Sequence, residues 1–260
     1  MFRALNVAAT GMAAQETNLD TLSDNLANAN TTGFKREQAE FEDLLYQNVR
    51  VPGISSTGAA MPVGVQLGSG SRVVSTARSF SEGTILQTGN QLDLAIEGQG
   101  FFGVQQPDGS VAYTRNGSLQ LDAQGHLVTG TGLPIEPGIT IPTNATSVTI
   151  GADGTVSVTQ PGNTTPNQVG KITLSNFPNP AGLNALGHNL FVATASSGDA
   201  VTATPGTDGL GTIMQNALEG SNVDVVTEMV NLIRTQRAYE VNSKVISAAD
   251  EMLQKATQTQ

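Results

Sequence analysis

Residues 220–260 read GSNVDVVTEMVNLIRTQRAYEVNSKVISAADEMLQKATQTQ and contain no proline and, after Gly220 itself, no glycine. Apolar residues recur here at a spacing of seven, with one between, namely Val225, Met229, Leu232, Tyr239, Ile246 and Leu253. Because this spacing gathers them on one face, the stretch predicts a long amphipathic α-helix. Ser221 and Asp224 match the capping-box pattern that begins a helix. A helix this long, at about 1.5 Å per residue, exceeds what a small domain needs, so its apolar stripe requires a partner.

A second stripe lies at the other end of the chain. It consists of Leu5, Met12, Leu19 and Leu26 at a spacing of seven, with Leu22 between them. Gln15 interrupts it, and neither helix is apolar at every heptad position, so a perfect two-stranded zipper is not predicted. The two stripes therefore indicate either a helical hairpin inside one domain or helices that pack against neighbouring molecules. The heptad also favours helix over a cleaved secretion signal for residues 1–14.

Composition limits the classes of function. The chain has 260 residues, of which 13% are charged and 4% aromatic, so we expect a core of small aliphatic side chains and more than one domain. Twelve Lys and Arg against 22 Asp and Glu give a net charge of −10, and the bases are scattered. This balance argues against nucleic acid or an anionic lipid membrane as a partner. The absence of cysteine excludes disulfides and thiolate metal sites.

The distribution of glycine and proline predicts the domain organisation. All prolines lie between Pro52 and Pro205, and Gly11 is the one glycine outside residues 33–220. We therefore expect an α+β fold, with residues 1–32 and 221–260 forming a coiled-coil-like helical layer. Residues 33–70 are expected to form an extended connection, and residues 71–220 a central antiparallel, mainly-β domain. Within it, residues 101–106 with 111–115, and residues 147–152 with 155–159, flank turn sequences and predict hairpins.

Patterns that would carry catalysis are weak. Gly98, Gly100 and Gly103 match the dinucleotide fingerprint, but a strand and a turn follow where that site needs a helix. Phe101 and Phe102 then point to opposite faces of this strand. The two histidines have no acidic cluster at ligand spacing, and the adjacent acids Glu42-Asp43 do not converge. We therefore predict no enzyme activity, no catalytic residue, no cofactor and no metal.

Three blocks of sequence carry a family resemblance. The first contains Asn25, Asn28, Gly33 and Phe34, the second contains Gly98, Gly100, Phe101, Phe102, Tyr113, Arg115 and Gly117, and the third contains Ser221, Asn222 and Val223. Together they resemble the signatures of bacterial flagellar axial proteins, the subunits of the rod and hook. Leu119 stands where the family pattern usually has phenylalanine, which is a conservative change.

Residues 46–68 show no periodicity and predict an extended, irregular segment. Pro52, Gly53, Pro62 and Gly64 punctuate it. This insertion resembles the stretch that distinguishes distal rod subunits from proximal rod and hook subunits. The resemblance implies that it packs between neighbouring subunits and makes the rod rigid. Composition alone is equally compatible with a disordered linker.

The resemblance implies a structural subunit of the distal rod that assembles helically into a shaft transmitting torque to the hook. The residues expected to pack terminal helices between subunits are Leu5, Met12, Leu19, Leu22, Leu26, Val225, Met229, Leu232, Tyr239, Ile246 and Leu253. The implied partners are copies of itself, proximal rod and hook subunits, the rod cap protein, the peptidoglycan-level and outer-membrane ring proteins, and the flagellar export apparatus. The implied location is the basal body, in the rod from the periplasm to the outer membrane, after export without a cleaved signal.

Two alternatives remain open. One is a hook or proximal rod subunit of the same family. The other is a secreted β-domain enzyme or carbohydrate-binding module with a helical oligomerisation stalk. The second lacks a catalytic constellation and has few aromatic platforms for sugars.

Overall fold

The computed structural model describes residues 2–50, 53–54, 60–61, 64–162 and 165–258. The chain divides into two compact units. The helical unit comprises Met1–Ala27, Glu37–Arg78 and Asp224–Gln260, and the β unit comprises Asn28–Arg36 and Ser79–Val223. Two long helices at the ends of the chain and antiparallel strands between them confirm the α+β class.

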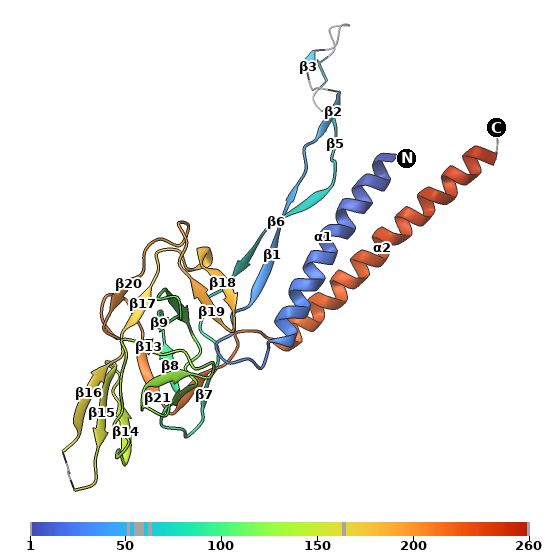
Figure 1. The fold of residues 1–260 in the computed structure, drawn as a ribbon. Coiled ribbons are helices and arrows are strands. Elements are labelled where there is room, and N and C mark those ends of the chain that lie inside the picture. The colour runs from blue at the N-terminus through green and yellow to red at the C-terminus, as the bar shows by residue number, and fades with distance from the viewer. Residues whose placement is uncertain (1, 51–52, 55–59, 62–63, 163–164, 259–260) are drawn as a thin grey trace. The chain divides into compact units, whose positions relative to one another are not determined.

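The helices are α1 (Phe2–Ala27) and α2 (Val225–Gln258). They pack side by side and antiparallel, so that both chain ends lie at the same end of the pair (Figure 1). Asn18 Nδ2 donates to Thr235 Oγ1 at 3.0 Å, and Gly11 faces Asn242. The pair is therefore a hairpin within one chain, and the predicted coiled-coil character is not confirmed. Neither described helix has the long uncharged apolar stretch that a membrane crossing requires.

The start of α2 corrects the predicted cap. Asp224, rather than Ser221, is the N-cap: its Oδ1 accepts from the Val226 amide at 3.0 Å and its Oδ2 from the Thr227 hydroxyl at 2.8 Å. Residues 221–223 are not helical. The physical reason is that the side chain of Asn222 is bonded to the backbone of the β unit, which keeps this segment extended.

This cap gives α2 a pH-dependent start. The hydrogen bond from Thr227 and then that from the Val226 amide lower the pKa of Asp224 below its ordinary value of 3.8. The stabilisation is therefore present above the unfolded pKa and lost as pH falls through the folded one. We expect the hydrogen-exchange protection of residues 226–228 to fall below pH 3.8. Asp224→Asn, which caps without titrating, should keep its protection over the same range.

The described residues between Glu37 and Arg78 form a two-stranded antiparallel ribbon in the helical unit (Figure 1). Its pairs are β1 (Glu37–Asp43) with β6 (Ser71–Arg78), β2 (Gln47–Arg50) with β5 (Val65–Leu67), and β3 (Gly53–Ile54) with β4 (Ala60–Met61). The described residues of the stretch 46–68 are therefore mostly paired strands, whereas the sequence predicted an extended but irregular segment. Backbone hydrogen bonds between the two arms form this ladder, and they need no alternation of apolar side chains.

The ribbon is fastened to α1. Arg3 donates to Gln47 Oε1 at 2.9 Å and to the Leu67 carbonyl at 2.7 Å. A Cβ on Gly70 would lie 2.0 Å from the Thr10 hydroxyl, so the backbone approaches the helix closely. These contacts explain why the ribbon groups with the helices, whereas we expected residues 33–70 to be a separate connection and residue 71 to begin the β domain.

The β unit is built from short antiparallel strands. Its largest sheet contains β18 (Asn184–Gly187), β19 (Leu190–Val192), β10 (Val111–Thr114), β9 (Phe101–Gln105), β17 (Leu174–Asn176) and β20 (Val201–Ala203) in that order, with β13 (Ile135–Glu136) on β9. The smaller sheets are β8 (Leu94–Glu97) with β21 (Thr212–Gln215), β7 (Ile85–Gln87) with β22 (Ala217–Glu219), β11 (Leu119–Leu121) with β12 (Leu127–Thr129), and β14 (Ser147–Ile150) with β15 (Thr155–Thr159) and β16 (Asn167–Lys171). A 3-10 turn spans Pro180–Gly182. The β9–β10 and β14–β15 pairs confirm both predicted hairpins.

Two of the three apolar clusters in the described β unit contain phenylalanines of β9. Phe102 lies in a large aliphatic cluster with Leu94, Ile96 and Leu174. Phe101 lies in an aromatic cluster with Tyr113, Phe177 and Phe191. The two phenylalanines therefore point to opposite faces, as predicted, and both are buried.

Candidate functional site

The contact between α1 and α2 uses the predicted apolar stripes only in part. Leu22 is buried; Leu5, Met12, Leu19, Leu26, Leu232, Ile246 and Leu253 are half-buried; and Val225, Met229 and Tyr239 are exposed. The most buried residues of the two helices are instead Ala8, Ala14, Leu22, Asn25, Glu228, Thr235 and Ala249. The most deeply buried side chains of the two helices are therefore mainly small or polar ones, and most of the predicted apolar stripe is less buried than they are.

A second apolar face on α2 was missed. It consists of Val226, Val230, Ile233, Val241, Val245 and Met252, all exposed, with Val226 at 71% and Val241 at 59%. Their spacings of three, four, seven and eight place them on one side of a helix. Thr235 is buried against α1, and Ile233 lies two residues away, about 200° around the helix, so this outer face points away from α1. A search for a second stripe beside the heptad would have found it.

The ribbon also exposes large apolar side chains. Leu45 is 89% exposed, and Tyr46, Val49, Val65 and Leu67 are exposed as well. Of the four residues predicted to provide rigidity, Gly53 lies in β3 and Gly64 directly precedes β5, whereas Pro52 and Pro62 lie outside the described residues. A two-stranded ribbon on its own is only marginally stable in water.

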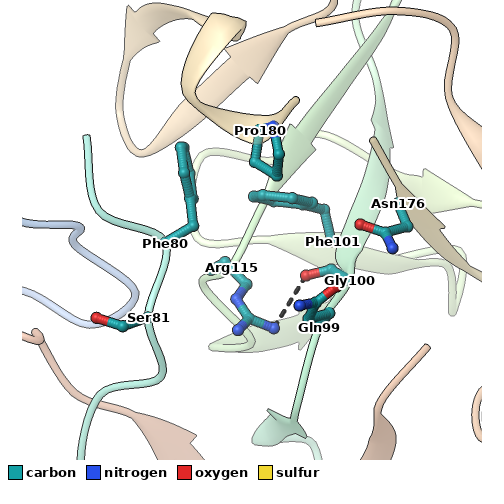
Figure 2. Close-up of a pocket in the computed structure, with 8 residues that line it drawn as sticks. All are labelled: Phe80, Ser81, Gln99, Gly100, Phe101, Arg115, Asn176 and Pro180. Atoms are coloured by element: carbon teal, nitrogen blue, oxygen red, sulfur yellow. Dashed lines mark hydrogen bonds between the residues drawn. The ribbon is translucent and has the colours of Figure 1, made fainter. Parts of the chain in front are cut away.

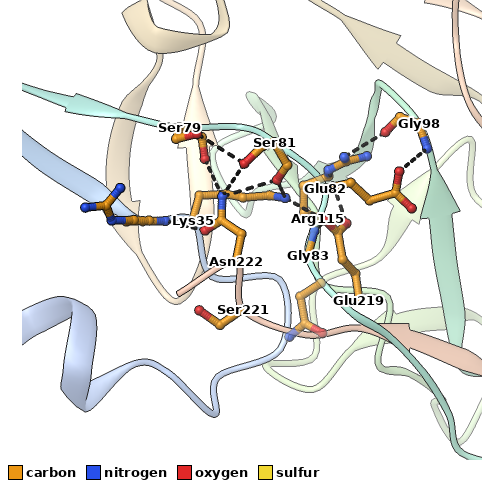
Figure 3. A network of polar contacts seen from close by, with 12 residues as sticks. Lys35, Ser79, Ser81, Glu82, Gly83, Gly98, Arg115, Glu219, Ser221 and Asn222 are labelled. Carbon is orange, nitrogen blue, oxygen red and sulfur yellow. Dashed lines mark hydrogen bonds and ion pairs between the residues drawn. The ribbon is translucent and has the colours of Figure 1, made fainter. Parts of the chain in front are cut away.

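A buried charge junction lies in the β unit (Figure 3). Lys35 Nζ donates to Glu219 Oε1 at 2.5 Å and to the Ser81 carbonyl at 2.6 Å. Arg115 Nε lies 3.3 Å from Glu219 Oε2, and the guanidinium donates to the carbonyls of Gly98 at 2.7 Å and Gly100 at 2.9 Å. The side chains of Lys35, Glu219 and Arg115 are 0%, 0% and 3% exposed.

Burial dominates the electrostatics of this junction. Burial lowers the pKa of Lys35. The nearby Glu219 carboxylate acts in the opposite direction, whereas the positive charge of Arg115 lowers this pKa further. Burial also lowers the pKa of Arg115, against the attraction of Glu219 and Glu82. The attraction of Glu219 opposes the effect of burial on both pKa values, and its removal would leave Lys35 and Arg115 without a buried counter-charge.

The resemblance residues beside the junction fasten chain segments together. Asn222 Oδ1 accepts from the Arg36 amide at 2.7 Å, and its Nδ2 donates to the Ser79 carbonyl at 2.8 Å and to Ser81 (Figure 3). Gly33 donates its amide to the Glu219 carbonyl at 2.8 Å. The junction therefore joins three parts of the β unit, which contain Lys35, Ser81 and Glu219. Each part lies close in sequence to a point at which the chain passes between the β unit and the helical unit.

The other resemblance residues have local roles. In the helical unit, Asn25 accepts from the Glu37 amide at 2.8 Å and donates to the Glu37 carbonyl at 2.7 Å. A Cβ on Gly117 would lie 1.7 Å from the Leu94 carbonyl oxygen, so only glycine fits there. Of the remaining resemblance residues, Asn28 accepts a hydrogen bond from the Thr31 hydroxyl, and Phe34 is buried. Ser221 and Val223 are half-buried. Lys35 and Glu219 lie within or beside the resemblance blocks. Because they are 184 positions apart, no local sequence pattern could predict that they pair.

A pocket of about 260 Å³ adjoins the junction (Figure 2). It is lined by Phe80, Ser81, Gln99, Gly100, Phe101, Arg115, Asn176 and Pro180. The Arg115 guanidinium lies 5.8 Å from the centre of the Phe101 ring, which Phe80 meets edge-on. The lining holds no pair of groups suited to acid–base chemistry. Among the described residues, no three histidine or acidic side chains are grouped as a metal site.

Comparison with known proteins matches all three blocks of the resemblance. Residues 5–35 match the flagella basal body rod protein model, residues 95–158 the flagellar hook protein FlgE/F/G D1 domain, and residues 214–259 the flagellar basal body rod FlgEFG protein C-terminal model. The flagellar basal-body rod protein FlgG of Buchnera aphidicola subsp. Schizaphis graminum is 50% identical over 99% of this chain and 100% of its own. FlgG of Caulobacter vibrioides is 50% identical over 98% of both chains, and FlgF of that species 34% over 99% of this chain and 98% of its own.

Proposed function

Since this chain belongs to the FlgG family of flagellar basal-body rod proteins, we propose that it polymerises helically through the outer face of α2 and the ribbon. The chain is a structural subunit of the flagellar distal rod. Identities of 50% to FlgG and 34% to FlgF of one species favour the distal rod over the proximal rod. The alternative of a secreted enzyme or sugar-binding module finds no support among these relatives.

The outer face of α2 is the observation that carries the proposal. Six aliphatic side chains lie exposed along one side of a helix whose other side already contacts α1. Burial of one such side chain is worth about 1.5–3 kcal/mol, so the isolated chain leaves a large stabilisation unrealised. The neighbour supplies a different surface from this face, and such heterologous contacts, when they do not close into a ring, generate a helical filament.

The predicted helix-packing residues take their place in this scheme. Val225, Met229 and Tyr239 are exposed and available to neighbours, whereas Leu22 is used within the chain. The half-buried members of the stripes serve both the hairpin and its neighbours. The paired helices form the inner tube of the shaft, and the β unit forms its outer layer.

The proposal extends to the wider role that the family resemblance implies. The shaft joins the proximal rod to the hook, carries torque and has no enzyme activity. Its remaining partners are the rod cap protein, the peptidoglycan-level and outer-membrane ring proteins and the export apparatus. It lies in the basal body between periplasm and outer membrane and is exported without a cleaved signal. The exposed ribbon packs between subunits and stiffens the shaft.

Electron microscopy of the purified chain at rising concentration tests polymerisation. We expect tubes from the native chain and none from Ile233→Asp at the same concentration, because a charge buried without a partner costs at least about 3 kcal/mol. That cost corresponds to about a hundredfold higher critical concentration. Ile233→Asp should keep its helix content, because Ile233 faces away from α1. Ile246, one of the predicted helix-packing residues, is a poorer position for this test, because it is half-buried and its substitution would also disturb the hairpin.

Ser243→Asp is the matched control, since it places the same charge at an exposed position of α2 outside the outer face. It should polymerise as the native chain does. Normal tubes from Ile233→Asp would show that the outer face is not an interface, and no tubes from the native chain at any concentration would contradict self-assembly.

A further inference from the structure

A hollow of about 380 Å³ lies between α1 and α2 in the helical unit. Its lining residues are Gln15, Glu16 and Leu19 on α1 and Gln236, Tyr239 and Glu240 on α2. Leu19 and Tyr239 supply apolar surface, whereas the exposed Glu16 and Glu240 supply two carboxylates. The hollow therefore suits a side chain that has an apolar stem and a positively charged end.

The polar side chains of the hollow are not engaged within the chain. In the part of the chain that the structure describes, neither the two carboxylates nor the Tyr239 hydroxyl makes a hydrogen bond or an ion pair. The side-chain amides of Gln15 and Gln236 make none either. These groups are therefore available to a group that a second molecule brings.

The matching cation lies on the outer face of α2. Arg237 is four residues after Ile233 and four residues before Val241, so it lies in the middle of that face. It is exposed and has no ion-pair partner among the described residues. Arg237 follows Thr235, which is bonded to α1, by two residues or about 200° around the helix. It therefore points away from α1 and cannot enter the hollow of its own chain.

We propose that Arg237 of one chain inserts into the hollow of a second copy and places its guanidinium between Glu16 and Glu240. This inference rests on the proposed function, because it supplies the surface that the outer face of α2 contacts on the neighbour. Every chain carries both the cation and the hollow, and they are different surfaces. The contact is therefore heterologous and repeats from copy to copy.

Arginine has the chemistry that this hollow selects. Its methylene stem packs on Leu19, and its planar guanidinium stacks on the ring of Tyr239. The fork of N–H donors binds carboxylates at the same time. The attraction between the charges strengthens as the contact excludes water. Ile233 and Val241, on either side of Arg237, provide the aliphatic surface that excludes it.

An exchange of charges between two chains tests the insertion. The donor variant is Arg237→Glu, and the acceptor variant is Glu16→Arg with Glu240→Arg. Each variant alone brings like charges together, so its tubes should require at least about a tenfold higher concentration than those of the native chain. All three positions are exposed, so circular dichroism should show the native helix content for each variant.

An equal mixture of the donor and acceptor variants should form tubes near the native concentration, because each chain then meets a partner of opposite charge. A single chain that carries all three substitutions should polymerise alone for the same reason. Electron microscopy and sedimentation of the mixture and of each chain measure the effect.

Lys244→Glu is the matched control for the donor. Lys244 is an exposed cation on the same side of α2, seven residues or about 10 Å beyond Arg237. That separation exceeds the Debye length of about 8 Å at physiological salt. A mixture of Lys244→Glu with the acceptor variant should therefore form no tubes at the native concentration.

Three results would overturn the insertion: normal tubes from the donor or acceptor variant alone, no tubes from their mixture, or equal restoration by Lys244→Glu. If the native chain still forms tubes and Ile233→Asp does not, the proposed polymerisation survives such a result. Absence of tubes from the native chain contradicts both.

Discussion

Replacing Glu219 by glutamine is expected to lower the free energy of unfolding of the β unit by about 3–5 kcal/mol. Glutamine keeps the size of the side chain and can still accept from the Gly83 amide, which donates to Glu219 Oε1 at 3.0 Å. The substitution removes only the charge that Lys35 and Arg115 share. Two buried cations would then face each other across a site with no buried anion. Urea unfolding followed by circular dichroism measures the loss, with an unchanged m value showing that the unfolding reaction is the same.

Glu82→Gln is the matched control for this prediction. Glu82 also accepts a backbone amide, that of Gly98 at 3.2 Å, but it is exposed. Its substitution should change stability by no more than about 0.5 kcal/mol. Lys35→Met added to Glu219→Gln should recover part of the loss, since one of the two uncompensated cations is removed. Equal, small effects of Glu219→Gln and Glu82→Gln would show that the junction does not hold the three segments together.

Removing the outer part of the ribbon is expected to yield shafts that are curved or bendable rather than straight. The cut is defined by the structure: Leu44 donates its amide to the Gly70 carbonyl at 2.9 Å, and Ser69 Oγ donates to the Leu45 carbonyl at 2.8 Å. The two arms are thus adjacent there, and an Asn-Gly turn in place of residues 46–68 can close the β1–β6 hairpin. β1, β6 and their contacts with α1 remain.

The expected loss of stiffness has a simple cause. A straight drive shaft needs contacts that prevent neighbouring subunits from sliding, and a segment that fills the gap between them to close-packed density blocks that motion. The removed residues include the exposed Tyr46, Val49, Val65 and Leu67, which would otherwise contact a neighbour. Electron micrographs of assembled shafts give their curvature and persistence length.

A second variant, in which a glycine–serine segment of the native length replaces residues 46–68, distinguishes the effect of side-chain packing from that of segment length. It preserves the number of residues but not the side chains, so its shafts should bend like those of the Asn-Gly variant. Straight shafts from the Asn-Gly variant would show that the ribbon is not the source of rigidity. Failure of that variant to polymerise at all would make the ribbon an assembly element rather than a stiffening one.

Local patterns were enough to predict both terminal helices, the two β-hairpins and the α+β class, whereas the family was indicated by resemblance to known signatures. Each local prediction rests on interactions between residues close in sequence: the 3.6-residue period that makes a stripe, the alternation of a strand, or an Asp-Gly turn. The opposite orientation of Phe101 and Phe102 follows from the pleat in the same way. These features need no knowledge of what the element will pack against.

What lies opposite each element was decided by the tertiary structure alone. The heptad showed that α2 has an apolar face, but only the position of α1 reveals that Thr235 is buried while Ile233 is exposed. Backbone pairing placed the described strands within residues 46–68 in a ribbon, and the hydrogen bonds of Asn222 moved the helix cap from Ser221 to Asp224. The charge of Lys35 is matched by Glu219, 184 residues away, because the fold places both side chains where water cannot reach them. Whether a side chain is buried, and which residue it contacts, depends on two segments of the chain that pack together. Local periodicity describes only one of those segments.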